Sequence, residues 1–353
     1  MSDLPVVVGV GGQTSIGLTF DATAAAVRAG LNAFSLSSFR LGRESGEAFK
    51  IGAIDTLAPD LSPYQRMASM ARAAAEEALR PWRAAGDLPE SEPVVVLLAV
   101  PENRSGFSED SGPPLLLDIV ADLPVAIQKR YTGLVSTGHE GGLGCLTYAA
   151  GLIRSGEASA CLVGGVDSYL DIDTLHRLEA EGRALLEQRP NGFVPAEGAG
   201  FLLVCSAALA RHEGLTPLCE LVAGGRGIES NPWQSGRATL GEGLTQAFQE
   251  VLAAHDPANG QIRVTYSDLN GESWRADEWA YAYVRTGPHH GSPLDLRVPA
   301  SNWGDVGAAS GPLLVGLAAL DLGRFFQPGD HALVWAASDG PPYRSACLLR
   351  SPA

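Results

Sequence analysis

The sequence is short of basic residues. Among its 353 residues, 25 are Lys or Arg and 40 are Asp or Glu, which gives a formal net charge of −15. Phosphate backbones repel a chain of this charge, so we expect no nucleic-acid partner. An acidic stretch at residues 86–92 is predicted to be a solvated loop rather than a docking site.

The sequence also lacks long apolar runs and a basic, apolar leader. No apolar stretch approaches the roughly 20 residues that cross a bilayer, and residues 1–5 lead directly into a predicted strand. The five cysteines are odd in number and lie mostly in predicted helices and strands, which favours reduced thiols over a disulfide framework. We therefore expect a cytoplasmic protein with no membrane partner.

Motifs for metals and cofactors are weak. His289 and His290 are adjacent in a loop rich in Gly and Pro, and no carboxylate or cysteine stands at ligand spacing from them. Gly9 and Gly11 follow a predicted strand, but the third glycine of a dinucleotide fingerprint is absent. With 45% hydrophobic residues the chain can still bury a large core. We expect a globular protein with no metal and no cofactor.

The most informative part of the sequence is residues 133–168. An apolar run ends at Thr137, a tight turn follows, and apolar residues then recur at helical spacing until Gly156 ends the helix. The next predicted strand, residues 161–166, contains paired glycines. The apolar residues of the helix are Leu143, Leu146, Ala149, Ala150 and Ile153. The pattern predicts a strand, a turn, a buried helix and a second strand.

This order resembles the nucleophile segment of the β-ketoacyl synthases of the thiolase superfamily. In that family an acyl-accepting cysteine begins the buried helix, seventeen residues before the glycine that ends it, and here that position is His139. A helix N-terminus favours thiolate but disfavours imidazolium, so we expect His139 to be neutral and a poor acyl carrier. Cys145 lies more than a turn and a half further along the helix and is predicted to be a packed residue.

The C-terminal part departs from the family at three more positions. The first catalytic histidine position, after a predicted strand at residues 262–266, holds Asn270. The second histidine and the lysine positions, within residues 300–311, hold Asp305 and Ala300. Condensation needs a thiolate and donors for developing negative charge, and loss of one such donor typically costs roughly 100- to 1,000-fold in rate. We expect no catalytic residue at these positions and no ketosynthase activity.

A further segment, residues 191–200, is similar to the G-F-V-x-x-E-G-A stretch that borders the acyl site in the family. The resemblance implies a remnant binding pocket formed by Phe193 together with His139, Asn270 and Asp305. A core or turn role for Phe193 is equally open at this stage.

The resemblance covers essentially the whole chain and implies an α/β protein of thiolase-like fold. We expect two similar layered α-β-α-β-α halves, residues 1–206 and residues 207–353. A closing hairpin is predicted at residues 332–349, with Asp339 in a turn that is rich in glycine in the family. Residues 102–114, rich in Gly, Ser, Pro and charge, are predicted to be a surface loop.

Three functions from different classes agree with these observations. The first is a catalytically inactive scaffold, adaptor or assembly accessory, and overall likeness connects it with type VI secretion toxin loading. The second is a partner subunit of an active ketosynthase, like a chain-length factor, in fatty-acid or polyketide synthesis. The third is an acyltransferase-family enzyme with altered chemistry at His139, Asn270 and Asp305.

The fold implies a partner protein. Subunits of the superfamily usually pair through a strand beside the nucleophile segment, here residues 133–137, so we expect a homodimer or a heterodimer with a ketosynthase-like subunit. Further candidates are an adaptor, a secreted effector and acyl carrier protein. The negative charge is awkward for an acidic carrier protein unless Arg177, Arg183 and Arg189 form a basic patch, and scattered arginines of this kind are more often a solvated face.

Overall fold

The computed structural model describes residues 4–40, 48–85, 92–186, 189–256 and 261–352. Most of the acidic stretch, residues 86–91, lies outside the described residues. The strands are β1 (Val6–Thr14), β2 (Ser35–Arg40), β3 (Ala48–Ile51), β4 (Val95–Ala99), β5 (Gly133–Val135), β6 (Ala160–Ser168), β7 (Glu197–Cys205), β8 (Cys219–Ile228), β9 (Ile262–Ser267), β10 (Leu296–Arg297), β11 (His331–Ala337) and β12 (Tyr343–Arg350). The α-helices are α1 (Phe20–Arg28), α2 (Pro63–Ala78), α3 (Arg80–Ala85), α4 (Gly112–Ala121), α5 (Gly141–Arg154), α6 (Ile172–Ala180), α7 (Ala207–His212), α8 (Glu242–Leu252), α9 (Ser273–Thr286), α10 (Ala300–Trp303) and α11 (Ser310–Phe325).

The main sheet repeats one topology twice. Its strands run in the order β10-β9-β11-β12-β8-β1-β7-β6-β4-β5. The sets β5-β4-β6-β7-β1 and β10-β9-β11-β12-β8 share the same order and the same directions, with two parallel pairings followed by two antiparallel ones. Among the described residues, β1 and β8 join the sets through two residue pairs, Val6 with Glu220 and Val7 with Cys219. Two sets of equal topology give the thiolase-like α/β fold that the sequence predicts, while the exact division at residue 206 stays a prediction.

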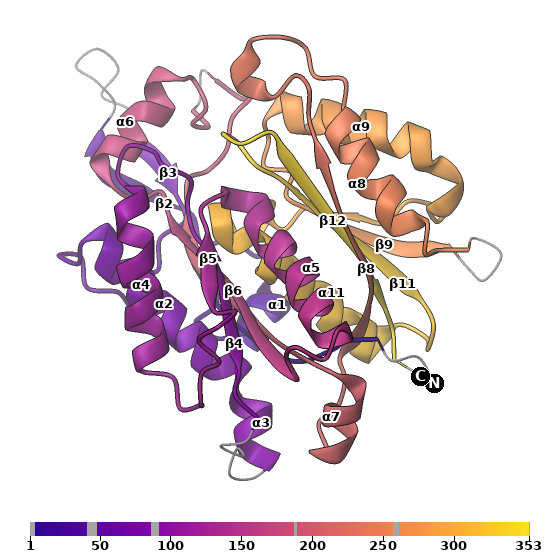
Figure 1. Cartoon of the computed structure of the whole chain (residues 1–353). Helices are drawn as coiled ribbons and strands as arrows, with labels where there is room; N and C mark the ends of the chain where they lie inside the picture. The colour runs from indigo at the N-terminus through magenta and orange to yellow at the C-terminus, as the bar shows by residue number, and fades with distance from the viewer. Residues whose placement is uncertain (1–3, 41–47, 86–91, 187–188, 257–260, 353) are drawn as a thin grey trace.

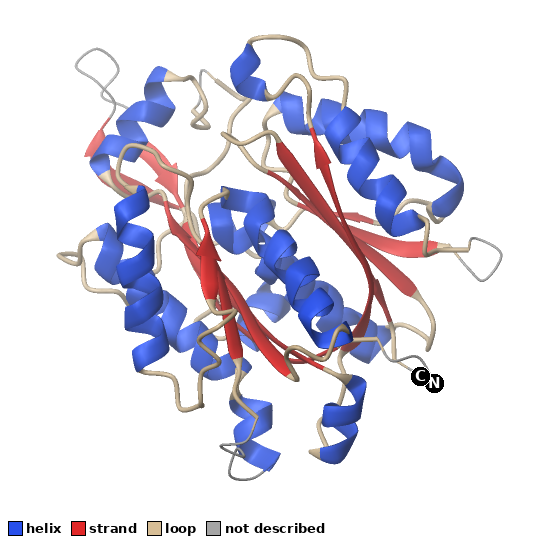
Figure 2. Cartoon of the chain, in the orientation of Figure 1, coloured by secondary structure: helices blue, strands red, loops and turns tan. Residues whose placement is uncertain are grey.

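Helices form layers inside and outside the two sets of strands. Helices α5 and α11 lie between the sets, where the largest group of buried apolar side chains surrounds them (Figure 1). Helices α2 and α4 cover the outer face of the first set, and α8 and α9 cover that of the second (Figure 2). The order of layers is therefore helix, sheet, helix, sheet, helix.

The opening strand is longer than the sequence pattern predicts. β1 continues to Thr14 because its second half pairs with β7, Gly11 with Phe201 and Gly12 with Gly200. A Cβ atom on Gly11 would lie 2.0 Å from the carbonyl oxygen of Ala74 in α2. The glycine therefore serves close helix packing, which explains it without a dinucleotide.

Two expectations about the chain's apolar and loop segments are corrected. Residues 102–114 are a loop only in part, since Pro113 lies in the first turn of α4, where a missing backbone N–H costs nothing. The segment Gly307–Phe325 is long and apolar enough to cross a membrane by length and composition, contrary to the expectation of no such run. It is 83% buried inside the protein, which is typical of the core helix of a soluble fold.

The predicted free thiols agree with the structure. All five cysteines are buried and none is in a disulfide. Cys145 is 4% exposed on α5, as its predicted packing role requires.

Candidate functional site

The four positions that differ from the family's motifs are His139, Asn270, Ala300 and Asp305. These four degenerate positions lie together. His139 is in a short 3₁₀ turn, Gly138–Glu140, directly before α5, and its Nε2 lies 2.8 Å from Oδ1 of Asp305. The side-chain amide of Asn270, at the end of β9, donates to Oδ2 of Asp305 at 2.6 Å. Ala300, the first residue of α10, borders the same small cavity as Asn270 and Asp305. Chain segments more than a hundred residues apart thus meet where the resemblance implies an active site.

Asp305 is fixed by its backbone as well as by its side chain. Its N–H donates to the carbonyl of Val194 and its carbonyl accepts from the N–H of Ala196, each within 2.9 Å. Gly304 before it has a φ of 88°, a conformation that favours glycine. Oδ1 also accepts the backbone N–H of Gly307 at 2.8 Å. Both carboxylate oxygens therefore have partners within the protein.

Little space is left at this position. The cavity bounded by Asn270, Ala300, Asp305 and their neighbours has a volume of about 10 Å³. A single water molecule needs roughly 10–15 Å³. An acyl chain therefore has no room there, and His139 and Asp305 are 1% and 3% exposed.

A network of buried ion pairs surrounds these residues. Arg183 pairs with Glu272 at 2.6 Å and with Asp339 at 2.7 Å, and Arg275 pairs with Asp268 at 2.7 Å and also with Asp339. We refer to His139, Asn270 and Asp305 with these ion pairs as the closed centre. Buried charges are tolerated when they are paired and hydrogen-bonded, and removal of one partner is costly.

Sequence reasoning missed these surrounding charges. Arg183 is 3% exposed and lies between the rings of Phe193 and Trp233, at 5.2 and 4.6 Å from their centroids. The solvated-face prediction is therefore wrong for Arg183, and it cannot join a surface patch. One signal was available: Glu272 and Asp339 are carboxylates inside two motifs that are rich in Gly and Thr in the family.

The electrostatics overturn the expectation of a neutral His139. Burial lowers the pKa of His139, but the carboxylates of Asp305 and Asp339 outweigh this and raise the pKa to about 9. Its Nδ1 lies 4.0 Å from Asp339. Burial raises the pKa of Asp305, and the facing imidazolium reverses this and holds that pKa well below its usual range. The helix dipole is a weaker influence than two nearby carboxylates, so His139 is an imidazolium at neutral pH.

Phe193 is part of the core beside the closed centre. It is 1% exposed and packs edge-on against Tyr169, with ring centroids 5.5 Å apart. The small cavity at Asp305 is lined by neither Phe193 nor His139. Of the two roles left open for Phe193, the structure shows the packing one.

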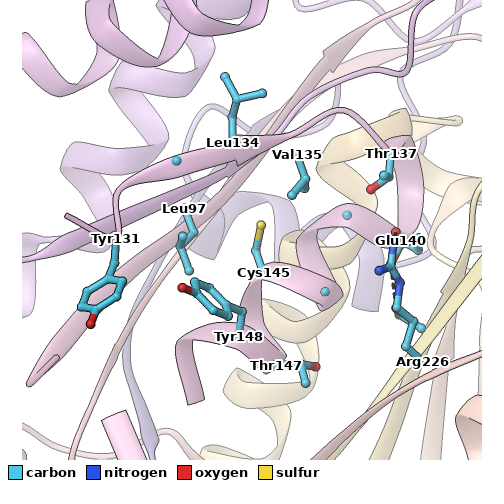
Figure 3. A pocket seen from close by; sticks show the side chains of 14 residues that line it. Leu97, Tyr131, Leu134, Val135, Thr137, Glu140, Cys145, Thr147, Tyr148 and Arg226 are labelled. Carbon is cyan, nitrogen blue, oxygen red and sulfur yellow. Dashed lines mark hydrogen bonds and ion pairs between the residues drawn. The ribbon is translucent and has the colours of Figure 1, made fainter. Parts of the chain in front are cut away.

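A larger cavity lies on the other side of the N-terminus of α5. It has a volume of about 360 Å³ and runs between β5 and α5 (Figure 3). Its lining is mostly apolar and comprises Leu97, Tyr131, Gly133, Leu134, Val135, Thr137, Glu140, Gly141, Gly144, Cys145, Thr147, Tyr148, Arg226 and Ser345. We call it the β5 pocket. None of the four degenerate positions lines it.

The polar end of the β5 pocket is already hydrogen-bonded. Glu140 accepts from Arg226 at 2.8 Å and from the hydroxyl of Ser345 at 2.7 Å. The guanidinium of Arg226 lies 3.8 Å from the centroid of the Tyr343 ring. Cys145 reaches into the pocket from α5, but burial raises the pKa of its thiol to about 12, so it is not a nucleophile at neutral pH.

The described residues contain no group of three or more His, Cys, Asp or Glu side chains arranged to hold a metal ion. His139 and Glu140, considered in isolation as an acid–base pair, point to different surroundings, the closed centre and the β5 pocket. Neither cavity therefore combines open space with paired acid and base groups.

Comparison with known proteins supports the resemblance. The sequence profile named "Beta-ketoacyl synthase, N-terminal domain" matches residues 134–210. The chain is 29% identical over 153 residues to a polyketide beta-ketoacyl synthase 1 from Streptomyces halstedii, covering 38% of this chain and 33% of that protein. It is 30% identical over 188 residues to a pikromycin polyketide synthase component from Streptomyces venezuelae, covering 50% of this chain and 12% of that protein. The matches thus span a third or less of these relatives.

Solved structures match over the whole chain. The structure titled "The ishigamide ketosynthase/chain length factor" has a TM-score of 0.79 at 16% identity, with 100% of both chains covered. A type II polyketide ketosynthase solved with its acyl-carrier protein has a TM-score of 0.77 at 17% identity, with 99% and 100% covered. These likenesses show the fold. The chain has a thiolase-like fold, and its residues 134–210 are similar to the N-terminal domain of β-ketoacyl synthases.

Proposed function

We propose that this chain is a non-catalytic ketosynthase-like subunit that acts by pairing with a second subunit of the ketosynthase fold, as a chain-length factor does beside its ketosynthase. The observation that carries the proposal is the closed centre. His139, Asn270 and Asp305 are hydrogen-bonded to one another, and the cavity beside them holds about 10 Å³. The relatives supply the setting, since one matched structure is named as a ketosynthase with its chain-length factor.

Condensation has no chemical basis at the closed centre. His139 replaces the thiolate that would carry the acyl group, and as an imidazolium it has no lone pair for attack. Asp305 places a carboxylate where negative charge would have to develop in the transition state. The charges of the site thus disfavour the transition state, and its small cavity leaves no room for an acyl chain.

An enzyme with altered chemistry is less well supported. That hypothesis requires a hydrogen bond between His139 and Asp305 together with a well-formed pocket. The hydrogen bond is present at 2.8 Å, but the space beside it is the size of one water molecule.

The end of the sheet at β5 is the surface we propose for pairing. β5 is the last strand at its end of the sheet among the described residues, so one side of its backbone can pair with another strand. Exposed apolar side chains flank it, Leu117 on α4 at 68%, Val135 on β5 at 37% and Tyr148 on α5 at 51%. A strand of the partner would extend the sheet, and its helix would cover the β5 pocket.

The other end of the sheet is protected by charge. β10 consists of Leu296 and Arg297, and Arg297 forms a two-bonded ion pair with Asp295 at 2.6 and 2.8 Å. Charged residues on an edge strand discourage pairing. The β5 end is flanked by exposed apolar side chains and the β10 end carries charge. This difference is expected if β5 is the end that associates.

The proposed absence of catalysis has a direct test. The purified chain is incubated with acyl and malonyl thioesters, and intact mass and product are measured, with an active ketosynthase as the positive control. We expect no adduct and no condensation product. A stable adduct together with a product would show that the closed centre opens and would overturn the proposal.

The partner is tested by affinity purification of the tagged chain from its native cells. Stoichiometric recovery of a ketosynthase, with or without acyl carrier protein, is the expected result. Recovery of a secreted toxin or a dedicated adaptor would instead favour the accessory role in type VI secretion, which otherwise stays a prediction. A Val135→Lys variant serves as the control, because a specific partner should be lost with the β5 surface.

A further inference from the structure

Four of the seven histidines lie together beside β9 and β11, and none of them belongs to the closed centre. His255 follows α8, His289 ends a 3₁₀ turn at Gly287–His289, His290 comes next, and His331 is the first residue of β11. Two connecting segments and the start of one strand thus meet at imidazole side chains. These histidines belong neither to the closed centre nor to the proposed pairing surface at β5.

The imidazoles touch one another. Nδ1 of His255 lies 3.1 Å from Nδ1 of His289, and their ring centroids are 5.4 Å apart. The ring of His331 meets that of His255 edge-on at 4.9 Å. Two ring nitrogens at 3.1 Å form a hydrogen bond only when one carries a proton and the other a lone pair. Once both rings are imidazolium, both nitrogens are donors and the contact becomes repulsive.

Backbone pairing connects the cluster to the edge of the sheet. His290 forms a β-bridge with Ile262, the first residue of β9, and Ile262 also pairs with His331. The N–H of Gly291 donates to the carbonyl of Ile262 at 2.9 Å, and β10 then pairs with β9. Residues 287–297 are therefore held on one side by β9 and on the other by imidazole contacts.

Of the groups that shift the pKa values of His290 and His331, Asp330 alone is negatively charged. Burial lowers the pKa of His331 to about 4, with His255 and Arg350 adding to the effect and Asp330 opposing it. Asp330 is itself 3.8 Å from Arg263. Burial, followed by His289 and His255, lowers the pKa of His290 to about 4. Among the described residues, Asp330 and Arg350 act on His331, Tyr283 packs on His290, and Arg263 pairs with Asp330.

We propose that His255, His289, His290 and His331 form an acid-sensitive latch that holds residues 287–297 against β9 and β11 and releases them as the pH falls. The ordered state favours neutral rings, because His255 and His289 share a hydrogen bond between ring nitrogens and the aromatic rings of Tyr283 and Trp279 pack on His290. Each proton taken up on release makes opening about tenfold more favourable per pH unit. The effect operates between the ordinary histidine value near 6.5 and the lowered values near 4.

The test is amide hydrogen exchange of the full chain at pH 7.5 and pH 5.0, corrected for intrinsic exchange rates. We expect opening of residues 287–297 to increase at least about 30-fold at pH 5.0 while α5 keeps its protection. His290→Gln removes one of the two imidazoles whose pKa burial lowers to about 4, so its pH response should be smaller. His212→Gln, at an exposed position on α7, is the control and should behave as the wild type.

Two outcomes would overturn the latch. Equal protection of residues 287–297 at both pH values would show that protonation does not release them. Simultaneous loss in α5 and residues 287–297 would show global unfolding instead. Because His290→Gln could fail to fold, histidine titrations of the wild type by NMR provide a second measurement. Values for His290 and His331 below about 5 support the proposal, and values near 6.5 contradict it.

Discussion

His139 and Glu140 are neighbours in the chain, yet they belong to two regions that differ in their open space and in their charge. His139 lies in the closed centre, where every charge is buried and about 10 Å³ of space remains. Glu140 lies at the β5 pocket, where about 360 Å³ is bordered mainly by apolar side chains beside an unpaired strand. The region where the resemblance implies an active site is filled here, and the open space lies at the β5 pocket instead.

The difference shows where this chain can interact. A filled, paired network contributes to the fold and offers nothing to a ligand, whereas an apolar pocket along an edge strand is stabilised when something covers it. Function should therefore be sensitive to changes at β5, and stability to changes at the closed centre.

The largest effect should come from Arg275→Met. Its guanidinium is fully buried and binds Asp268, Asp339 and the carbonyl of Ala337. Removing one partner of a buried charge network costs about 3–5 kcal/mol, measured as the free energy of unfolding in urea. The matched comparison is Arg226→Met at the β5 pocket, where 48% of the side chain is exposed and its buried partner Glu140 keeps the hydrogen bond from Ser345, so a smaller loss of about 1–3 kcal/mol is expected. Equal losses would remove the distinction between the two regions.

The next effect concerns association. Val135→Lys places a charge on β5, and we expect self-association or partner binding to weaken at least about 100-fold with unchanged stability of the monomer. Sedimentation velocity at micromolar concentration measures it. Val284→Lys on α9 is the same change at a side chain that is 77% exposed, and it should have no effect. A monomeric wild type that also binds no partner would count against the β5 surface.

A smaller effect is the pH dependence of the closed centre. The pKa of His139 in the folded chain, about 9, is above its unfolded value near 6.5. Its contribution to stability is therefore complete below pH 6.5 and is lost as the pH rises through 9, with a slope of at most about 1.4 kcal/mol per pH unit for one proton. Thermal unfolding of the wild type and His139→Gln between pH 6 and 10 measures it. The variant should have the flatter profile, and parallel profiles would mean that His139 is neutral after all.

The smallest effect is expected at Cys145. Although it borders the open pocket, burial raises the pKa of its thiol to about 12, and the charge of Glu140 adds to this. Iodoacetamide should leave the native protein unmodified at neutral pH over a time in which the denatured chain reacts at its cysteines. Rapid alkylation of Cys145 in the native state would contradict this prediction, because it would show that the thiol lining the β5 pocket is reactive.

The sequence predicts local features of this molecule well. Helix α5 and its neighbouring strands follow from apolar spacing, which reports burial directly. The meeting of His139, Asn270, Asp305 and Ala300 follows from the resemblance, because each stands at a matching motif position. Each of these features was predicted from a short segment of sequence, either a helical repeat of apolar residues or a single motif.

The charge state of His139 could not be predicted in this way. Sequence reasoning considered only the helix that follows it, whose dipole contributes about 0.3–1 kcal/mol. The deciding groups, Asp305 and Asp339, stand 166 and 200 residues away in the chain, so nothing in the local pattern reports them. The burial of Arg183 was missed for the same reason, since its partners Glu272 and Asp339 stand 89 and 156 residues away in the chain.

The ion pairs of the closed centre run between the two sets of strands. His139 and Arg183 precede residue 206, while Asp305, Glu272 and Asp339 follow it. Only two residue pairs join β1 to β8 directly, so these contacts are a principal polar link across the middle of the molecule. The closed centre lies where the resemblance implies an active site. In this chain its ion pairs join one half to the other. We expect the halves to melt in a single cooperative transition for that reason.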